Sequence, residues 1–100
     1  MTAATPLDIT ATDAGLAIAG ELDAHTAPLL SEAIASIEDG DVRLDMAAVT
    51  FVDSSGLRVL IEAHRSAEAD GRMVEICRPS QSLRRLLEIS GVDCHLNIVD

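Results

Sequence analysis

The chain has 100 residues, of which 48% are hydrophobic, and its seven basic and seventeen acidic side chains give a formal net charge of −10. This length suffices for one domain with a single core. The core must be aliphatic, since Phe51 is the one aromatic residue. An acidic chain repels nucleic-acid phosphates and anionic lipids, and no apolar run approaches the roughly 20 residues that cross a bilayer, so we expect neither nucleic acid nor membrane as a partner.

The first structured segment is expected to be a β-hairpin. Apolar residues at 7, 9 and 11 alternate with polar ones, as is typical of a strand. Residues 13–15 (DAG) have turn chemistry, and residues 16–19 (LAIA) are expected to form the returning strand.

A helix should follow and begin just before Pro28, because proline fits only the first turn of a helix. Asp23 or Thr26 is the expected cap. Apolar residues at 29, 30, 33, 34 and 37 share one face at helical spacing, and Asp39-Gly40 is expected to end the helix.

The middle of the chain predicts a third strand and a second helix. Residues 42, 44 and 46 are apolar and alternate, which indicates the strand, whereas residues 49–52 are expected in the connection after it. The pattern changes abruptly at residues 53–56 (DSSG). Residues 57, 60, 61 and 64 then recur at helical spacing, with the helix ending near Asp70-Gly71.

The last third predicts a strand over residues 73–76, a helix opened by Pro79-Ser80 with Ser80 as N-cap, and a short edge strand over residues 96–99. Gly91 is expected to stop that helix. Strands separated by helices imply right-handed parallel crossovers. The sequence therefore predicts an α/β fold: a mixed sheet of four to five strands, opened by an antiparallel hairpin, continued by parallel strands and packed with three main helices.

Ser54 and Ser55 are expected at the junction between the third strand and the second helix. The first N–H groups of a helix have no intrahelical partner and attract anions, so a serine here either caps the helix or carries a phosphate. Gly56 would leave room for a partner's backbone or a nucleotide, and Asp53 would orient or polarise the hydroxyl. A simple capped turn is the competing interpretation, because Ser, Asp and Gly clusters are common in turns.

Two segments together carry a resemblance. Residues 20–27 (GELDAHTA) and 51–57 (FVDSSGL) closely resemble the two signature stretches of bacterial anti-sigma factor antagonists of the STAS-domain family. The resemblance covers nearly the whole chain and implies one STAS domain over residues 1–100, with no catalytic activity of its own and no cofactor.

The resemblance also implies a mechanism. Family members bind an anti-sigma factor that is also an ATP-dependent serine kinase, which frees the sigma factor; the kinase then phosphorylates the serine after the motif's aspartate, and a PP2C-type phosphatase reverses this. By position, Ser54 is the phosphoacceptor and its neighbour Ser55 is the second candidate. Asp23, Asp53 and Gly56 match positions at or beside the partner-binding surface.

Arg58 departs from the family pattern, because many members have a second glycine at this position. It would add bulk and positive charge beside the acceptor, and would either pair with the phosphate, alter the choice of kinase, or be an exposed helix residue without a role. The alternative function for the chain is a STAS subunit that docks on a transporter ATPase without phosphorylation. The complete DSSG motif favours the antagonist.

The sequence contains no residue pattern typical of a metal site, a serine hydrolase or a nucleotide-binding loop. His25, His64 and His95 are too scattered for a metal site, and neither a nucleophile elbow nor a Walker-type phosphate loop is present. Residues 1–6 lack the features of a signal peptide, so we expect a cytoplasmic protein. Cys77 and Cys94 are expected as free thiols at opposite edges of the sheet.

Overall fold

The structure, a computed structural model, describes residues 7–92 and 96–99. The elements in chain order are β1 (Leu7–Thr12), β2 (Gly15–Leu22), α1 (Ala27–Ala35), β3 (Val42–Val52), α2 (Ser54–Ala69), β4 (Val74–Cys77), α3 (Gln81–Ser90) and β5 (Asn97–Val99). The five strands form one sheet in the same order, in which β1 and β2 are antiparallel and the other neighbours are parallel. The predicted α/β fold is therefore confirmed.

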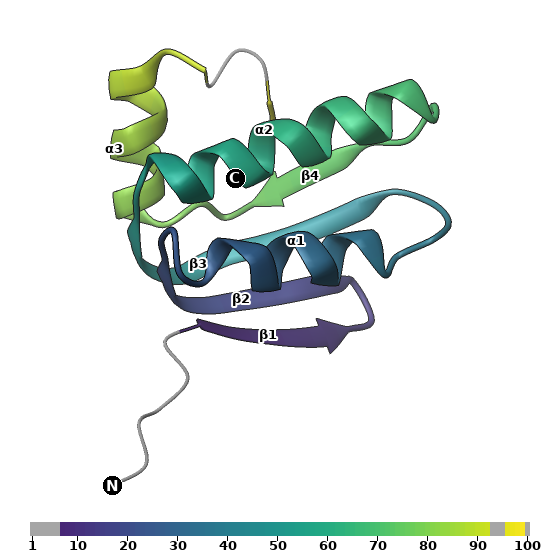
Figure 1. Cartoon of the computed structure of the whole chain (residues 1–100), viewed down its shortest axis with the longest axis horizontal. Coiled ribbons are helices and arrows are strands. Elements are labelled where there is room, and N and C mark those ends of the chain that lie inside the picture. Colours follow the sequence, from purple (N-terminus) through teal and green to yellow (C-terminus); the bar gives the residue numbers. More distant parts are fainter. Residues whose placement is uncertain (1–6, 93–95, 100) are drawn as a thin grey trace, which may run out of the picture.

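The helices leave one face of the sheet open. Helices α1 and α2 lie side by side over one face, and α3 stands at the end of the sheet where α2 begins (Figure 1). Leu44 and Met46 of β3 point into the core beneath these helices and are fully buried. On the opposite face Arg43 pairs with Glu75 at 2.9 Å. Because successive side chains of a strand point to opposite faces, one strand supplies both the core and the open surface.

Strand β3 is longer than expected. The sequence placed Val49, Phe51 and Val52 in a connection, but β3 continues to Val52 and pairs with β2 along most of its length. The register between β2 and β3 shifts twice, so the simple alternation of buried residues stops after Met46. Val49 and Val52 are buried and Phe51 is 48% exposed. A pattern of strict period two could not detect this second half of the strand.

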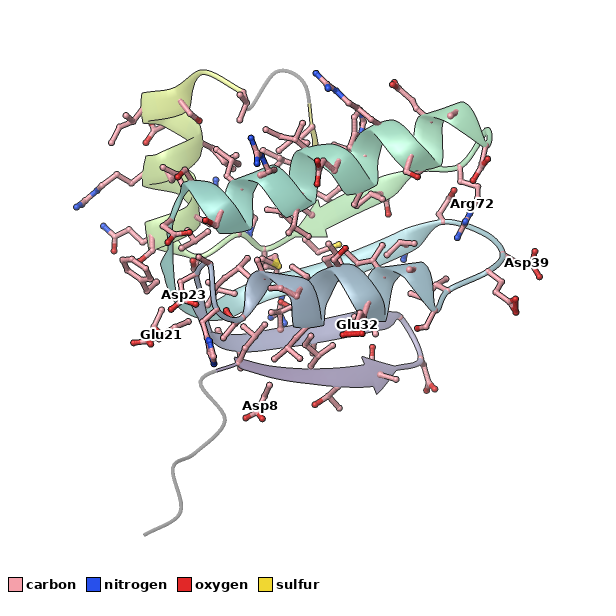
Figure 2. The ribbon with its side chains drawn as sticks, in the orientation of Figure 1. Asp8, Glu21, Asp23, Glu32, Asp39 and Arg72 are labelled. Atoms are coloured by element: carbon pink, nitrogen blue, oxygen red, sulfur yellow. The ribbon has the colours of Figure 1, made fainter. Side chains whose placement is uncertain are left out.

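Helix α1 is shorter than expected. It ends at Ala35, and Ile37, although partly buried against the core, lies in the loop before β3. The Arg72 side chain supports this loop, since Nη2 donates to the Ile37 carbonyl at 2.9 Å and Nε to the Gly40 carbonyl at 2.7 Å. Figure 2 shows Arg72 reaching toward the loop that also carries Asp39. Apolar spacing at Ile37 therefore reflects packing and not a continued helix.

Strand β2 is also longer than expected, because it runs to Leu22, whereas the sequence predicts the returning strand only over residues 16–19. The ends of α2 and α3 agree with the sequence. Helix α2 ends at Ala69, and the Ser80 hydroxyl accepts the Leu83 N–H at 3.2 Å as the cap of α3. Gly91 ends α3 in the left-handed conformation, with φ of 73°. Cys77 is a free thiol at the end of β4, whereas Cys94 lies outside the described residues.

Candidate functional site

Two aspartates lie together at the carboxyl ends of the neighbouring strands β2 and β3. Asp23 follows β2 and Asp53 follows β3, and because these strands are parallel neighbours, their carboxyl ends meet. The Asp53 N–H donates to the Leu22 carbonyl at 3.2 Å, which joins the two strand ends directly. The tertiary structure thus brings together the two sequence segments that carry the motifs.

Asp53 is the N-cap of α2. Its Oδ1 accepts the N–H of Ser55 at 2.9 Å and of Gly56 at 3.2 Å, which satisfies two of the first free donors of the helix. Of the two roles left open for a serine here, capping the helix therefore belongs to Asp53. The capping oxygen of Asp53 is directed at backbone N–H groups, and within residues 7–92 and 96–99 the Ser54 hydroxyl forms no hydrogen bond with Asp53 or any other group.

The two serines differ in exposure. Ser54, the first residue of α2, is exposed, whereas Ser55 is half-buried. Both border a groove between the first turns of α1 and α2, whose other lining residues are Ala24, Ala27, Pro28, Ser31, Arg58 and Val59. Ser54 also borders a second hollow on the other side of α2, together with Leu57, Arg58, Ile61, Glu62 and Arg65. Ser54 and Arg58 therefore form the ridge between the two depressions.

Gly56 faces the interior. It is buried, and a Cβ built on it would lie 2.6 Å from Leu22 Cγ and 3.0 Å from the Leu22 carbonyl oxygen. The missing side chain therefore does not leave room for a partner or nucleotide, as expected from the sequence, because Leu22 occupies that space. The glycine instead lets the start of α2 approach the end of β2.

Asp23 organises the loop before α1. Its Oδ1 accepts the N–H groups of His25 and Thr26, each at 3.0 Å. Thr26, the N-cap residue of α1, is fully buried; its hydroxyl accepts the Asp23 N–H at 2.9 Å and donates to the Glu21 carbonyl at 2.8 Å. Neither residue forms the expected side-chain cap on α1, because both are bonded within the loop. Figure 2 shows Asp23 and Glu21 at the end of the molecule opposite Asp39 and Arg72.

The buried, hydrogen-bonded role of Thr26 beside Asp23 is not visible in the sequence. A threonine two positions before Pro28 is a signal of a helix start, but not of a buried hydroxyl that bonds back to β2. That contact depends on where the strand ends relative to the helix.

The contacts of Asp23 in this loop should make the stability of the fold depend on pH. The backbone hydrogen bond from Thr26, helped by the one from His25, holds the pKa of Asp23 below its ordinary value of 3.8, although desolvation opposes them. Since the folded-state pKa is the lower one, the carboxylate stabilises the fold above pH 3.8, and this contribution is lost as the pH falls through the folded-state pKa. We expect Asp23→Asn to unfold at lower urea concentration than the wild type at pH 7, with the difference shrinking below pH 3.8. A difference that is constant over this range would contradict the assignment.

The histidines do not gather. His25 lies in the loop before α1, His64 lies on α2 with Nε2 3.6 Å from Glu68, and His95 is outside the described residues. In residues 7–92 and 96–99 no group of three or more potential metal ligands occurs. No helix in the same part of the chain is long and apolar enough to span a membrane.

Comparisons with known proteins agree on one family. The model of the STAS domain matches residues 6–100. A Listeria monocytogenes protein named anti-sigma-B factor antagonist is 37% identical over 78 residues, which are 75% of this chain and 68% of that protein. The anti-sigma-B factor antagonist of Bacillus subtilis is 31% identical over 77 residues, or 75% and 71% of the two chains.

Solved structures share the fold. An anti-sigma factor antagonist from Mycobacterium paratuberculosis superposes with a TM-score of 0.77 at 22% identity, covering 93% of this chain and 83% of the other. The Bacillus cell fate determinant SpoIIAA in its phosphorylated form gives a TM-score of 0.67 at 21% identity, with 94% and 91% covered.

Proposed function

Since this chain belongs to the STAS-domain family, we propose that it acts as an anti-sigma factor antagonist whose binding to an anti-sigma factor is switched off by phosphorylation of Ser54. The observation that carries the proposal is the exposed hydroxyl of Ser54 at the first position of α2, beside an aspartate that already caps the helix. Because the Ser54 hydroxyl forms no hydrogen bond in the described residues, modifying it removes no side-chain contact that supports the fold.

The partner in this proposal is an anti-sigma factor that is also a serine kinase. Binding frees the sigma factor. Transfer forms a bond between Ser54 Oγ and the γ-phosphorus of ATP, breaks the bond to the ADP leaving group, and sends the hydroxyl proton to a base of the kinase. A PP2C-type phosphatase hydrolyses the ester again. The chain is thus a substrate and binding partner in the cytoplasm, with no catalysis of its own.

Ser54 is favoured over Ser55 for a geometric reason. A kinase must place the acceptor oxygen in line with the γ-phosphate. The exposed Ser54 offers its side chain to such a partner, whereas Ser55 is half-buried and donates its N–H to Asp53. The adjoining groove between α1 and α2 supplies a surface on which a partner can rest, beside Asp23 and Asp53.

Charge accounts for the switch. A phosphate adds about −1.5 to −2 charge to a surface that already holds the exposed Glu21 and the partly exposed Asp23 and Asp53. The start of α2 tolerates an anion, because the helix dipole is positive there. We therefore expect phosphorylation to change the affinity for the partner while the fold stays the same, in line with the shared fold of the phosphorylated SpoIIAA structure.

The test combines phosphate mapping with binding. We expect the cognate kinase and ATP to label the wild type and Ser55→Ala at Ser54, as located by mass spectrometry, and to leave Ser54→Ala unlabelled. In a titration with the anti-sigma factor, Ser54→Glu should bind at least about tenfold more weakly than the wild type, because like charges at an interface are costly. Stoichiometric phosphate elsewhere in Ser54→Ala, or unchanged affinity of Ser54→Glu, would contradict the proposal.

A further inference from the structure

Arg58 lies one helical turn after Ser54 on α2, and its side chain is exposed. We propose that Arg58 is the internal counter-ion of the phosphate on Ser54, so that the phosphorylated chain holds its own modified serine in an ion pair. The inference rests on the proposed phosphorylation of Ser54 and assigns a regulatory residue to that site.

The geometry places the two side chains on one face. Residues four apart on a helix are neighbours, with Cβ atoms about 5–6 Å apart. Ser54 and Arg58 are also the two residues that border both hollows at the start of α2. A phosphate on Ser54 would extend over this ridge, within reach of the long arginine side chain.

Arg58 has no other task in the described structure. Arg43 and Arg78 form ion pairs with Glu75 and Asp45, and Arg72 holds the loop before β3. In contrast, within residues 7–92 and 96–99 the guanidinium of Arg58 takes part in no hydrogen bond or ion pair, even though Glu62 follows it by one turn. A phosphate on Ser54 would therefore find an uncommitted cation.

The surrounding charges favour the pairing. On α2 the neighbouring groups are Glu62 and Arg65 in the second hollow and Asp53 at the N-cap; across the groove, Asp23 and His25 flank Ala24. The dianionic phosphate carries more charge than the single carboxylate of Glu62, and arginine binds phosphate with two parallel hydrogen bonds. Arg58 is thus expected to turn toward residue 54 once the phosphate is present.

Pairing has a consequence for the switch. Phosphorylation would change the partner surface in two ways at once. It adds a negative group at residue 54, and this group pairs with Arg58, the one positive side chain that borders both hollows. The ion pair also stabilises the phosphorylated form of the chain relative to a variant with a neutral residue at position 58.

The experiment places phosphoserine at position 54 during translation and therefore needs no kinase. A ³¹P NMR titration measures the second pKa of the phosphate, whose ordinary value is about 6. Arginine favours the dianion and lowers this pKa, so we expect it to be higher in Arg58→Gln than in the wild type by about 0.5, as for an exposed ion pair. Arg65→Gln, which removes the same charge two turns farther along α2, is the matched control and should leave the phosphate pKa unchanged.

The outcomes separate this inference from the proposed function. Equal phosphate pKa values in Arg58→Gln and the wild type, or an equal rise in Arg65→Gln, would overturn the role of Arg58. Arg58→Gln should not change the melting temperature of the unphosphorylated chain, which excludes a general loss of fold. Failure of the kinase to label Ser54 would instead reject the proposed function and leave the measured ion pair intact.

Discussion

Replacing Gly56 by alanine is expected to lower the free energy of unfolding by about 1–3 kcal/mol, the usual cost of overpacking a tight interior. In an exposed helix the same change would raise stability by up to about 1 kcal/mol, because alanine is the better helix former. The sign reverses here since the new methyl group would lie 2.6 Å from Leu22 Cγ. Leu22 is fully buried, and its carbonyl oxygen, 3.0 Å from the new Cβ, accepts the Asp53 N–H.

Urea unfolding of two further variants isolates the cause. Ser66→Ala, at an exposed position of α2, is the control and should change stability by no more than about 0.5 kcal/mol. Leu22→Ala alone should cost about 2–5 kcal/mol, but the double variant Leu22→Ala/Gly56→Ala should cost less than the two single changes combined, because the smaller side chain leaves room for the methyl group. Stability equal to the wild type in Gly56→Ala would show that α2 does not rest on β2 in this way.

Replacing Asp53 by alanine is expected to lower the free energy of unfolding by about 0.5–2 kcal/mol, the range measured for lost N-caps. The carboxylate accepts two N–H groups, from Ser55 and Gly56, and alanine leaves both without a protein partner. Fraying would begin at the turn that carries Ser54, so the change should also reduce the labelling rate by the kinase.

Asp53→Asn is the matched variant for this prediction. Asparagine caps helices about as well as aspartate and keeps the acceptor oxygen, so most of the stability should remain. Denaturant unfolding measures both variants under the same conditions. If Asp53→Asn lost as much stability as Asp53→Ala, the capping hydrogen bonds would not be the reason for the effect.

Local chemistry was sufficient for most of the fold. Pro28, Ser80 and Gly91 mark helix ends through their own backbone and side-chain preferences, and each acts as such in the structure. The alternation at residues 42–46 likewise identified β3, because a half-buried strand must show apolar residues with period two. These signals depend on residues near one another in the chain, so they are visible without a structure.

Long-range contacts decided the rest. The second half of β3 was missed because its register against β2 shifts, and a register belongs to a pair of strands. The role of Thr26 was missed because its hydroxyl bonds back to Glu21 at the end of β2. Helix α1 was expected to be too long because Ile37 packs on the core from a loop.

The sequence by itself determined that Asp53 and Ser54 lie where a strand passes into a helix, since the change from period two to helical spacing is local. Only the tertiary structure decided which group does what there. Asp53 caps the helix and Ser54 is left exposed. Position 56 accommodates only glycine because Leu22 of β2 occupies the space that a side chain would need. Burial and free hydrogen-bonding capacity depend on neighbours distant in the chain, and these two properties distinguish a structural serine from one that a partner can modify.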